Sequence, residues 1–142
     1  MAKKRIRSLN FDIDWDDTAV VEKVKDIVDR ETAKAAEIAY QTAEKLCPVD
    51  TGELINAIKI DKSLFPDGGY VVRVDNPFTD EKERKNFAIK VNSVEFGHFT
   101  HSKKDDVALK YIAPRPFMRP AIKKVKRTFR KQVQTAIEEG MA

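Results

Sequence analysis

The amino-terminal part of the chain alternates between apolar and polar residues. The apolar positions are Leu9, Phe11, Ile13 and Trp15. Alternation with a period of two is typical of a strand with one buried face, so we expect a strand over residues 8–15. The basic residues before it lack an apolar pattern, and we expect residues 1–7 to form a flexible arm.

The pattern then changes to spacings of three and four, which predicts one long amphipathic helix over residues 17–46. Its apolar stripe consists of Val20, Val24, Ile27, Val28, Ala35, Ile38, Ala39, Ala43 and Leu46. Pro48 ends the helix, because the residue before a proline is disfavoured in helical geometry. About 30 residues at 1.5 Å each give about 45 Å. This exceeds the width of a small domain, so we expect part of the stripe to extend past the core and to need a partner.

Residues 54–112 return to strand-like patterns. Before them, the segment from Pro48 to Leu54 predicts a turn in which Asp50 caps the amide of Glu53, as in a capping box. The sequence from Pro66 to Gly69 is a strong turn signal between two strands of a hairpin. Further strands are expected over residues 87–96 and 107–112, with charged loops near 76–86 and 97–106. Together these segments predict an antiparallel sheet.

A second helical pattern covers residues 117–139. Its apolar positions are Met118, Ile122, Val125, Phe129, Val133, Ala136 and Ile137. We therefore expect an α+β fold in a single domain, in which a curved antiparallel β-sheet packs against a long amino-terminal helix and a carboxy-terminal helix.

Composition narrows the class of protein. The chain has 142 residues, of which 42% are hydrophobic and 35% charged, and a formal net charge of +4. These values are typical of a globular protein with a heavily charged surface. Cys47 is the single cysteine, so no internal disulfide can form. No apolar run approaches the length of a membrane span, so we expect synthesis and folding in a cytoplasm and no contact with a membrane.

Few residues suggest chemistry at a reactive centre. Glu95, His98 and His101 are three residues apart, a spacing that would gather metal ligands on one face of a helix. Gly97 and the strand pattern favour a strand that leaves into a loop, where this spacing has no such meaning. Cys47 has no histidine nearby in sequence, and we find no glycine-flanked serine or phosphate-binding glycine loop. We expect no catalytic residue, no metal and no cofactor.

Positive charge is concentrated in the last helix. Its candidate phosphate or subunit contacts are Lys123, Lys124, Lys126, Arg127, Arg130 and Lys131, with no acidic residue among them. Such a face could bind DNA phosphates in a salt-dependent manner, or it could meet an acidic neighbouring subunit. A small nucleic-acid-binding module therefore remains an alternative function.

Three short strings resemble motifs of one protein family. The first string runs from Ala43 to Leu54 and contains Pro48, Asp50, Thr51, Gly52 and Leu54. The second runs from Val94 to Gly97 and contains Glu95, Phe96 and Gly97, and the third runs from Pro114 to Ala121 and contains Pro116, Phe117, Arg119, Pro120 and Ala121. In this order they resemble the gene-product-ten-like family of HK-ninety-seven-type phages, also called tail-completion, head–tail joining or minor tail component proteins. The resemblance spans residues 35–133. The amino-terminal strand and the charged loop around residues 80–85 depart from it. Asp-Thr-Gly also occurs in aspartic proteases, but those enzymes need a second carboxylate.

The resemblance implies a structural virion protein without catalytic residues. Relatives of this type form rings, commonly hexameric, around the channel through which DNA passes. The partners implied are further copies of the chain, a head connector or adaptor, and tail-tube or tail-terminator proteins, with non-specific contact to translocating DNA. The location implied is the head–tail interface or the tail end. Glu95 and Arg119 are charged residues inside the motifs, and we expect them to pair within or between subunits.

Overall fold

A computed structural model describes residues 4–8, 11–15, 17–66, 68–100 and 110–142, and it describes side chains from residue 17 onward. The elements are β1 (Lys4–Ser8), β2 (Phe11–Trp15), α1 (Asp17–Leu46), α2 (Glu53–Asn56), β3 (Ile58–Lys62), β4 (Tyr70–Val74), α3 (Glu81–Phe96), β5 (His98–Thr100), β6 (Lys110–Ile112) and α4 (Met118–Met141). The fold is α+β, as the sequence predicts.

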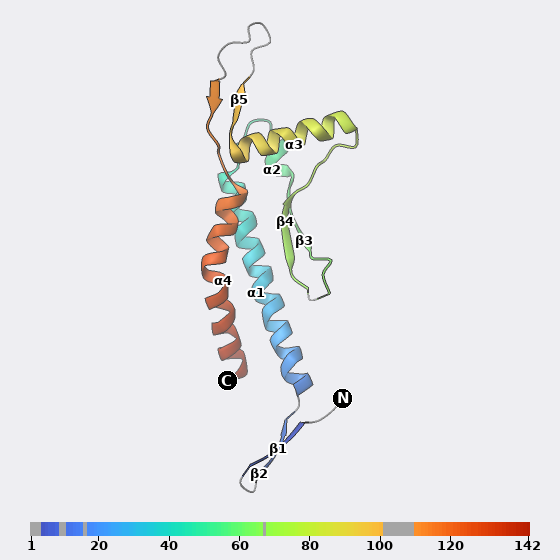
Figure 1. Cartoon of the computed structure of the whole chain (residues 1–142), viewed down its shortest axis with the longest axis vertical. Helices are drawn as coiled ribbons and strands as arrows, with labels where there is room; N and C mark the ends of the chain where they lie inside the picture. The colour runs from blue at the N-terminus through green and yellow to red at the C-terminus, as the bar shows by residue number, and fades with distance from the viewer. Residues whose placement is uncertain (1–3, 9–10, 16, 67, 101–109) are drawn as a thin grey trace.

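The framework of the molecule is an antiparallel pair of long helices, α1 and α4 (Figure 1). The buried residues of α1 are Ile27, Ala35, Ala36, Ala39 and Ala43, and most are alanines because small side chains let two helices approach closely. At the lower end, a Cβ added at Gly140 would lie 2.5 Å from Ile27 Cδ1. Residues 17–26 of α1 include no buried position, so the first turns of this helix extend past the core as expected.

The hairpin of β3 and β4 covers one side of α1. The two strands are antiparallel, with Ile58 opposite Val74 and Ile60 opposite Val72. These apolar pairs share one face, and both strands contact α1. The connection turns through Gly68, which has a φ of 82°, a conformation that glycine adopts without strain. The turn predicted from Pro66 to Gly69 therefore closes this hairpin.

The strand predicted for residues 87–96 is wrong, and the charged loop predicted near 76–86 ends at Asp80. Residues Glu81–Phe96 form helix α3, which lies across the top of the helix pair (Figure 1). Asp80 is its N-cap, and its carboxylate accepts from the amides of Lys82 at 3.0 Å and Glu83 at 3.2 Å. The apolar alternation of Phe87, Ile89 and Val91 is compatible with a helix in which Phe87 is buried and Ile89 is exposed.

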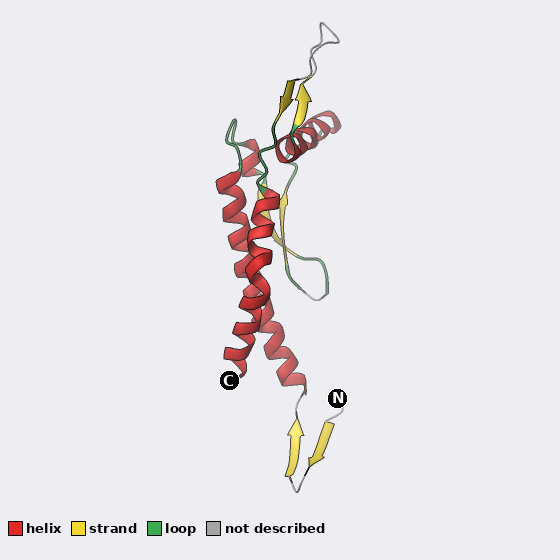
Figure 2. Ribbon diagram, turned by 60° about the vertical axis from the view of Figure 1, so that its left-hand side comes forward, coloured by secondary structure: helices red, strands yellow, loops and turns green. Residues whose placement is uncertain are grey.

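The single curved sheet is also wrong, because the strands form three separate two-stranded antiparallel sheets (Figure 2). Helix α3 lies between β4 and β5 in the chain and occupies the place where further strands were expected. Of the strand predicted over 107–112, Lys110–Ile112 forms β6, and residues 107–109 lie outside the described residues. The loop predicted over 97–106 contains β5, and its residues 101–106 also lie outside the described residues.

The flexible arm predicted for residues 1–7 is partly replaced by a strand. Residues Lys4–Ser8 pair antiparallel with Phe11–Trp15, so the residues expected as one strand over 8–15 belong to two strands, and residues 9–10 lie outside the described residues. The register sets Arg5 opposite Asp14 and Arg7 opposite Asp12.

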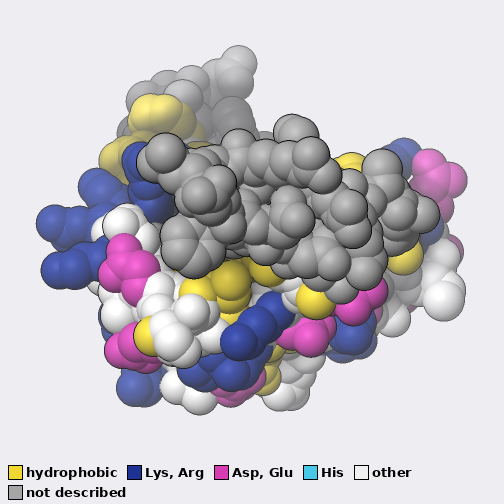
Figure 3. All heavy atoms as spheres, turned by 90° about the horizontal axis from the view of Figure 1, so that it is seen from below, with side chains coloured by type: hydrophobic (Ala, Val, Ile, Leu, Met, Phe, Trp, Pro, Cys, Tyr) yellow, Lys and Arg dark blue, Asp and Glu magenta, His cyan; other side chains and the backbone are white. Residues whose placement is uncertain are grey.

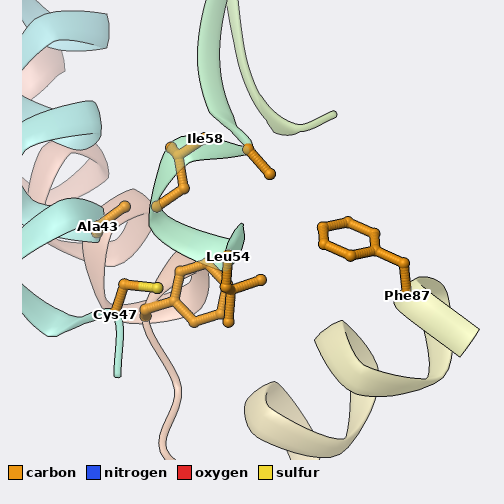
Figure 4. Packing of buried hydrophobic residues seen from close by; sticks show 8 residues of the cluster. Ala43, Cys47, Leu54, Ile58 and Phe87 are labelled. Atoms are coloured by element: carbon orange, nitrogen blue, oxygen red, sulfur yellow. The ribbon is translucent and has the colours of Figure 1, made fainter. Parts of the chain in front are cut away.

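The main core lies where α1, α2, α3 and α4 meet. Its buried members are Ala43, Cys47, Leu54, Ala57, Ile58, Phe87, Phe117 and Ala121. Figure 4 shows Leu54 and Cys47 on one side of this cluster and Phe87 reaching in from α3. No helix in the described part of the chain is both long enough and apolar enough to cross a membrane.

Candidate functional site

The three sequence strings that resemble phage proteins meet at one place, the top of the helix pair. Cys47 and Leu54 of the first string and Phe117 and Ala121 of the third belong to the same buried cluster. The backbone amide of Arg115 donates to the carbonyl of Val94 at 2.8 Å, which joins the second string to the third. We call this meeting point the α3–α4 junction.

The centre of the α3–α4 junction is the carboxylate of Glu95. Its Oε2 accepts from the backbone amides of Phe117 at 2.9 Å and Met118 at 3.2 Å, and its Oε1 accepts from the amide of Arg119 at 3.0 Å. The first amides of a helix have no partner within the helix, and the fourth residue here is Pro120, which has no N–H. One carboxylate therefore satisfies every amide at the start of α4 that can donate.

The side chain of Arg119, in α4, also forms hydrogen bonds to α3. Its Nε donates to Glu95 Oε1 at 3.1 Å, and its Nη2 donates to the backbone carbonyl of Glu95 at 2.6 Å. The guanidinium also lies 4.6 Å from the ring centroid of Phe96, a cation–π distance. Glu95 and Arg119 thus pair within one chain. The sequence had left open whether they pair within a subunit or between subunits.

The environment keeps Glu95 ionised. Burial of its carboxylate would raise the pKa of Glu95, but the hydrogen bonds from the three amides and the Arg119 guanidinium outweigh burial and hold the pKa below its ordinary value. A buried carboxylate with all of these donors stabilises the start of α4. Its oxygens are occupied, so they are poorly placed to bind a metal or move a proton.

Gly97 closes the other side of the junction. Its φ is 76° and its amide donates to the carbonyl of Ser93, ending α3. A Cβ at this position would lie 2.8 Å from the carbonyl oxygen of Ile112, 2.8 Å from Tyr111 Oη and 3.0 Å from Pro114 Cδ. Gly97 therefore allows both the left-handed backbone and the close approach of β6, although it follows a helix and not the predicted strand.

The capping box predicted at Asp50 is wrong. Helix α2 begins at Glu53 with Gly52 as its N-cap, at a φ of 82°, and no side chain caps it. The helix starts too late in the turn for the Asp50 carboxylate to reach its first amides. Asp50 and Thr51 are exposed, so of the first string it is Leu54 that enters the core.

Five further predicted site residues lie at buried or half-buried positions. Pro116 is half-buried before α4, Pro120 lies in its first turn, Phe117 and Ala121 are buried, and Pro48 is half-buried. Pro48 and His98 line a pocket of about 290 Å³ beside Ile112. The Nδ1 of His98 is buried there without a hydrogen-bond partner among the described residues.

The candidate metal ligands do not come together in the described part of the chain. Glu95 faces α4 and His98 lies in β5, while His101 is outside the described residues. No group of three histidine, cysteine, aspartate or glutamate side chains suited to a metal is found where the structure describes side chains. Burial raises the pKa of the Cys47 thiol, which disfavours the reactive thiolate.

The six basic candidates lie on the solvent-exposed surface of α4, where Lys126, Arg127 and Lys131 border pockets shared with α1. Lys123, Lys124, Lys126, Arg127, Arg130 and Lys131 are all exposed. Within residues 17–66, 68–100 and 110–142, none of them forms an ion pair. In Figure 3, lysine and arginine side chains gather along the edge on which α4 lies in Figure 1. Their charge is therefore available to a partner outside the chain.

Large apolar side chains are also exposed, a feature that the sequence pattern did not locate. Leu64 is fully exposed and Phe65 is 77% exposed at the tip of the β3–β4 hairpin. A groove of about 450 Å³ runs between α1, β4 and α4 and is lined mainly by apolar residues, among them Ala36, Val72 and Ile122. Isolated exposed apolar residues are ordinary, but such clusters are typical of interaction surfaces.

Comparisons with known proteins give no relative: no family model, no curated protein and no solved structure matches this chain.

Proposed function

We propose that the chain is a structural subunit of a tailed bacteriophage, which assembles with copies of itself into a ring at the junction of head and tail or at the tail end. The role at the head–tail junction or the tail end is proposed because the three strings that build the α3–α4 junction resemble motifs of tail-completion and head–tail joining proteins. In this proposal the junction is a structural element, and the protein acts through its surfaces and not through a reactive centre.

The observation that carries the proposal is the apolar surface that the described residues leave open. Leu64 is fully exposed and Phe65 is 77% exposed at the tip of the β3–β4 hairpin, and the apolar groove of about 450 Å³ between α1, β4 and α4 has no occupant among the described residues. Exposed apolar clusters of this kind are typical of interaction surfaces. A subunit of a ring needs two different interfaces, one on each side.

The polar groups at the junction support a structural role. Glu95 is the buried charged side chain of the described core, and its hydrogen bonds all serve to fix α3 against α4. A rigid connection of this kind holds the exposed surfaces of α3 and α4 at a fixed angle. Fixed angles are what a closed ring requires from each subunit.

The test is genetic and structural. In a phage or prophage that carries this gene, its disruption should yield heads and tails that fail to join or tails that remain incomplete in electron micrographs. A plasmid copy should restore complete particles, and mass spectrometry of purified virions should then detect the chain. Infectious virions of normal appearance that lack the chain would refute the proposal.

A second candidate function is binding of nucleic acid, and the exposed basic face of α4 favours it. The six cations lie on one side of one helix without ion pairs among the described residues. A ring subunit could use the same face on DNA that passes through the channel, whereas a free-standing module would bind DNA as a monomer. The oligomeric state of the DNA-binding species separates the two.

A further inference from the structure

The chain exposes two apolar surfaces, a hairpin tip and a groove. The tip of the β3–β4 hairpin, residues Leu64 and Phe65, presents two large apolar side chains to solvent. The apolar groove between α1, β4 and α4 has no occupant from the described part of the chain. We name these surfaces the knob (Leu64 and Phe65) and the groove (lined by Ala35, Ala36, Ala39, Val72, Ile122 and Phe129).

The knob is held in a defined shape. The amide of Ser63 donates to the carbonyl of Gly69 at 2.9 Å, and the amide of Gly68 donates to the carbonyl of Phe65 at 3.0 Å. The amide of Phe65 also donates to Ser63 Oγ at 3.2 Å. A tip ordered in this way loses little conformational entropy when it binds. The glycine side of the connection lies beside α1, where a Cβ added at Gly68 would be 3.6 Å from Asp29 Oδ1, while Leu64 and Phe65 face solvent. Figure 2 shows this connection as an open curve beside the helix pair.

The groove has the size and character of a binding pocket for apolar groups. Its volume of about 450 Å³ lies within the range of about 300 to 1,000 Å³ that is usual for pockets occupied by compact ligands. Its floor consists of the alanine stripe of α1, which leaves room for large side chains, and its walls come from β4 and α4. Ile122 is 52% exposed at its rim, which indicates apolar surface still open to a partner.

From this pairing we infer that the knob of one copy inserts into the groove of the next copy, and that this contact forms the head-to-tail interface of the assembly. The inference rests on the proposed ring. A contact between two different patches on identical chains repeats from copy to copy, and it gives a ring when the rotation between neighbouring copies closes. The knob and the groove are formed by different residues of the described chain, so each copy can provide both.

The test uses three variants of the full chain. In the knob variant, Leu64→Asp is combined with Phe65→Asp. The groove variant is Ile122→Asp. The matched control is Ile89→Asp, because Ile89 is also an exposed isoleucine within a helix, at 63% exposure, and it lies outside the groove. Circular dichroism and cooperative urea unfolding first establish that all three variants are folded.

Size-exclusion chromatography with light scattering then gives the mass of each sample. The wild-type chain and Ile89→Asp should form the same oligomer. The knob and groove variants should each weaken association by about 100-fold or more, since the loss of buried anchor residues has effects of this order. Each should therefore elute as a monomer. An equimolar mixture of the two should form a complex of two chains, because it retains one intact knob and one intact groove.

The outcomes separate this inference from the proposed function. A wild-type oligomer that persists in the knob or the groove variant overturns the inference and leaves the ring proposal intact. Two monomeric variants that do not combine when mixed also overturn the pairing. A wild-type chain that remains monomeric overturns the ring proposal and the inference with it.

Discussion

The carboxylate of Glu95 accepts a hydrogen bond from the backbone amide of Phe117 at 2.9 Å, across 22 residues of sequence. The last turn of α3 thereby caps the first turn of α4. Caps are usually supplied by the residue just before the helix, but Phe117 has no side-chain acceptor for this purpose. The direction of α4 consequently depends on α3, and the two helices form one rigid unit.

Replacement of Glu95 by glutamine should destabilise the protein. Glutamine is similar in size but loses the negative charge, and its NH₂ group cannot accept from the α4 amides. Hydrogen bonds to charged groups contribute about 1.5–3 kcal/mol, so the free energy of unfolding should fall by about 2–3 kcal/mol. Urea denaturation measures the change. Glu139→Gln, at an exposed position of α4, is the control and should stay within about 0.5 kcal/mol of wild type. Equal stability of the two variants would contradict the cap.

The stability difference between wild type and Glu95→Gln should depend on pH. The pKa of Glu95 is lowered in the folded state, below its value of about 4.3 in the unfolded chain. The contribution of Glu95 is therefore fully present above about pH 4.3 and is lost as the pH falls through the folded pKa. Urea denaturation of both proteins between neutral and acidic pH should show the difference shrinking at the acidic end. A difference that grows on acidification would mean that the pKa is raised.

Replacement of Gly97 by alanine should be more harmful than replacement of Gly52 by alanine. Both glycines have a positive φ, 76° and 82°, so both variants carry backbone strain of about 1–3 kcal/mol. A Cβ at Gly97 would also lie 2.8 Å from the carbonyl oxygen of Ile112, whereas the nearest atom at Gly52 is 3.7 Å away. Thermal unfolding should give a lower Tm for Gly97→Ala. Equal values would show that β6 does not pack closely against the end of α3.

If the basic face of α4 binds DNA, the affinity should depend steeply on salt. For duplex DNA the logarithm of the binding constant falls with a slope of about −0.9 per phosphate contact. Joint replacement of Lys123, Arg127 and Arg130 by glutamine should therefore make the slope shallower by about 2.7. Fluorescence anisotropy over a range of salt concentrations measures both slopes. An unchanged slope in the triple variant would exclude this face as the DNA contact.

Much of the helical framework could be predicted from the sequence, because its signals are local and continuous. The spacing of apolar residues from Val20 to Leu46, followed by Pro48, gives the bounds that α1 has in the structure. The hairpin of β3 and β4 follows in the same way from the turn at Pro66 to Gly69. The α+β class depends only on such local patterns.

Helix α3 was missed although a signal was present. Phe87, Ile89 and Val91 alternate as in a strand, while Asp80 followed by Glu83 matches the signature of a helix start. The alternation predicts a strand, whereas the segment is a helix. Burial of Phe87 against Phe78, with ring centroids 5.8 Å apart, favours the helix through a contact that the sequence pattern alone does not show.

The role of Glu95 could not be predicted, because its partners lie on another helix. A glutamate among apolar residues near a glycine indicates an unusual position, and the sequence reading did single out Glu95 and Arg119. The identity of the acceptor for the α4 amides depends on how α3 crosses the helix pair. Tertiary contacts of this kind have no local signal.

The central claim is that the chain assembles with itself, and native mass spectrometry of the purified wild-type protein at micromolar concentration tests it most directly. We predict one dominant species whose mass is an integral multiple of 16.2 kDa, with six copies expected from the family resemblance. A single species with the mass of one chain, unchanged as the concentration rises, would contradict the account.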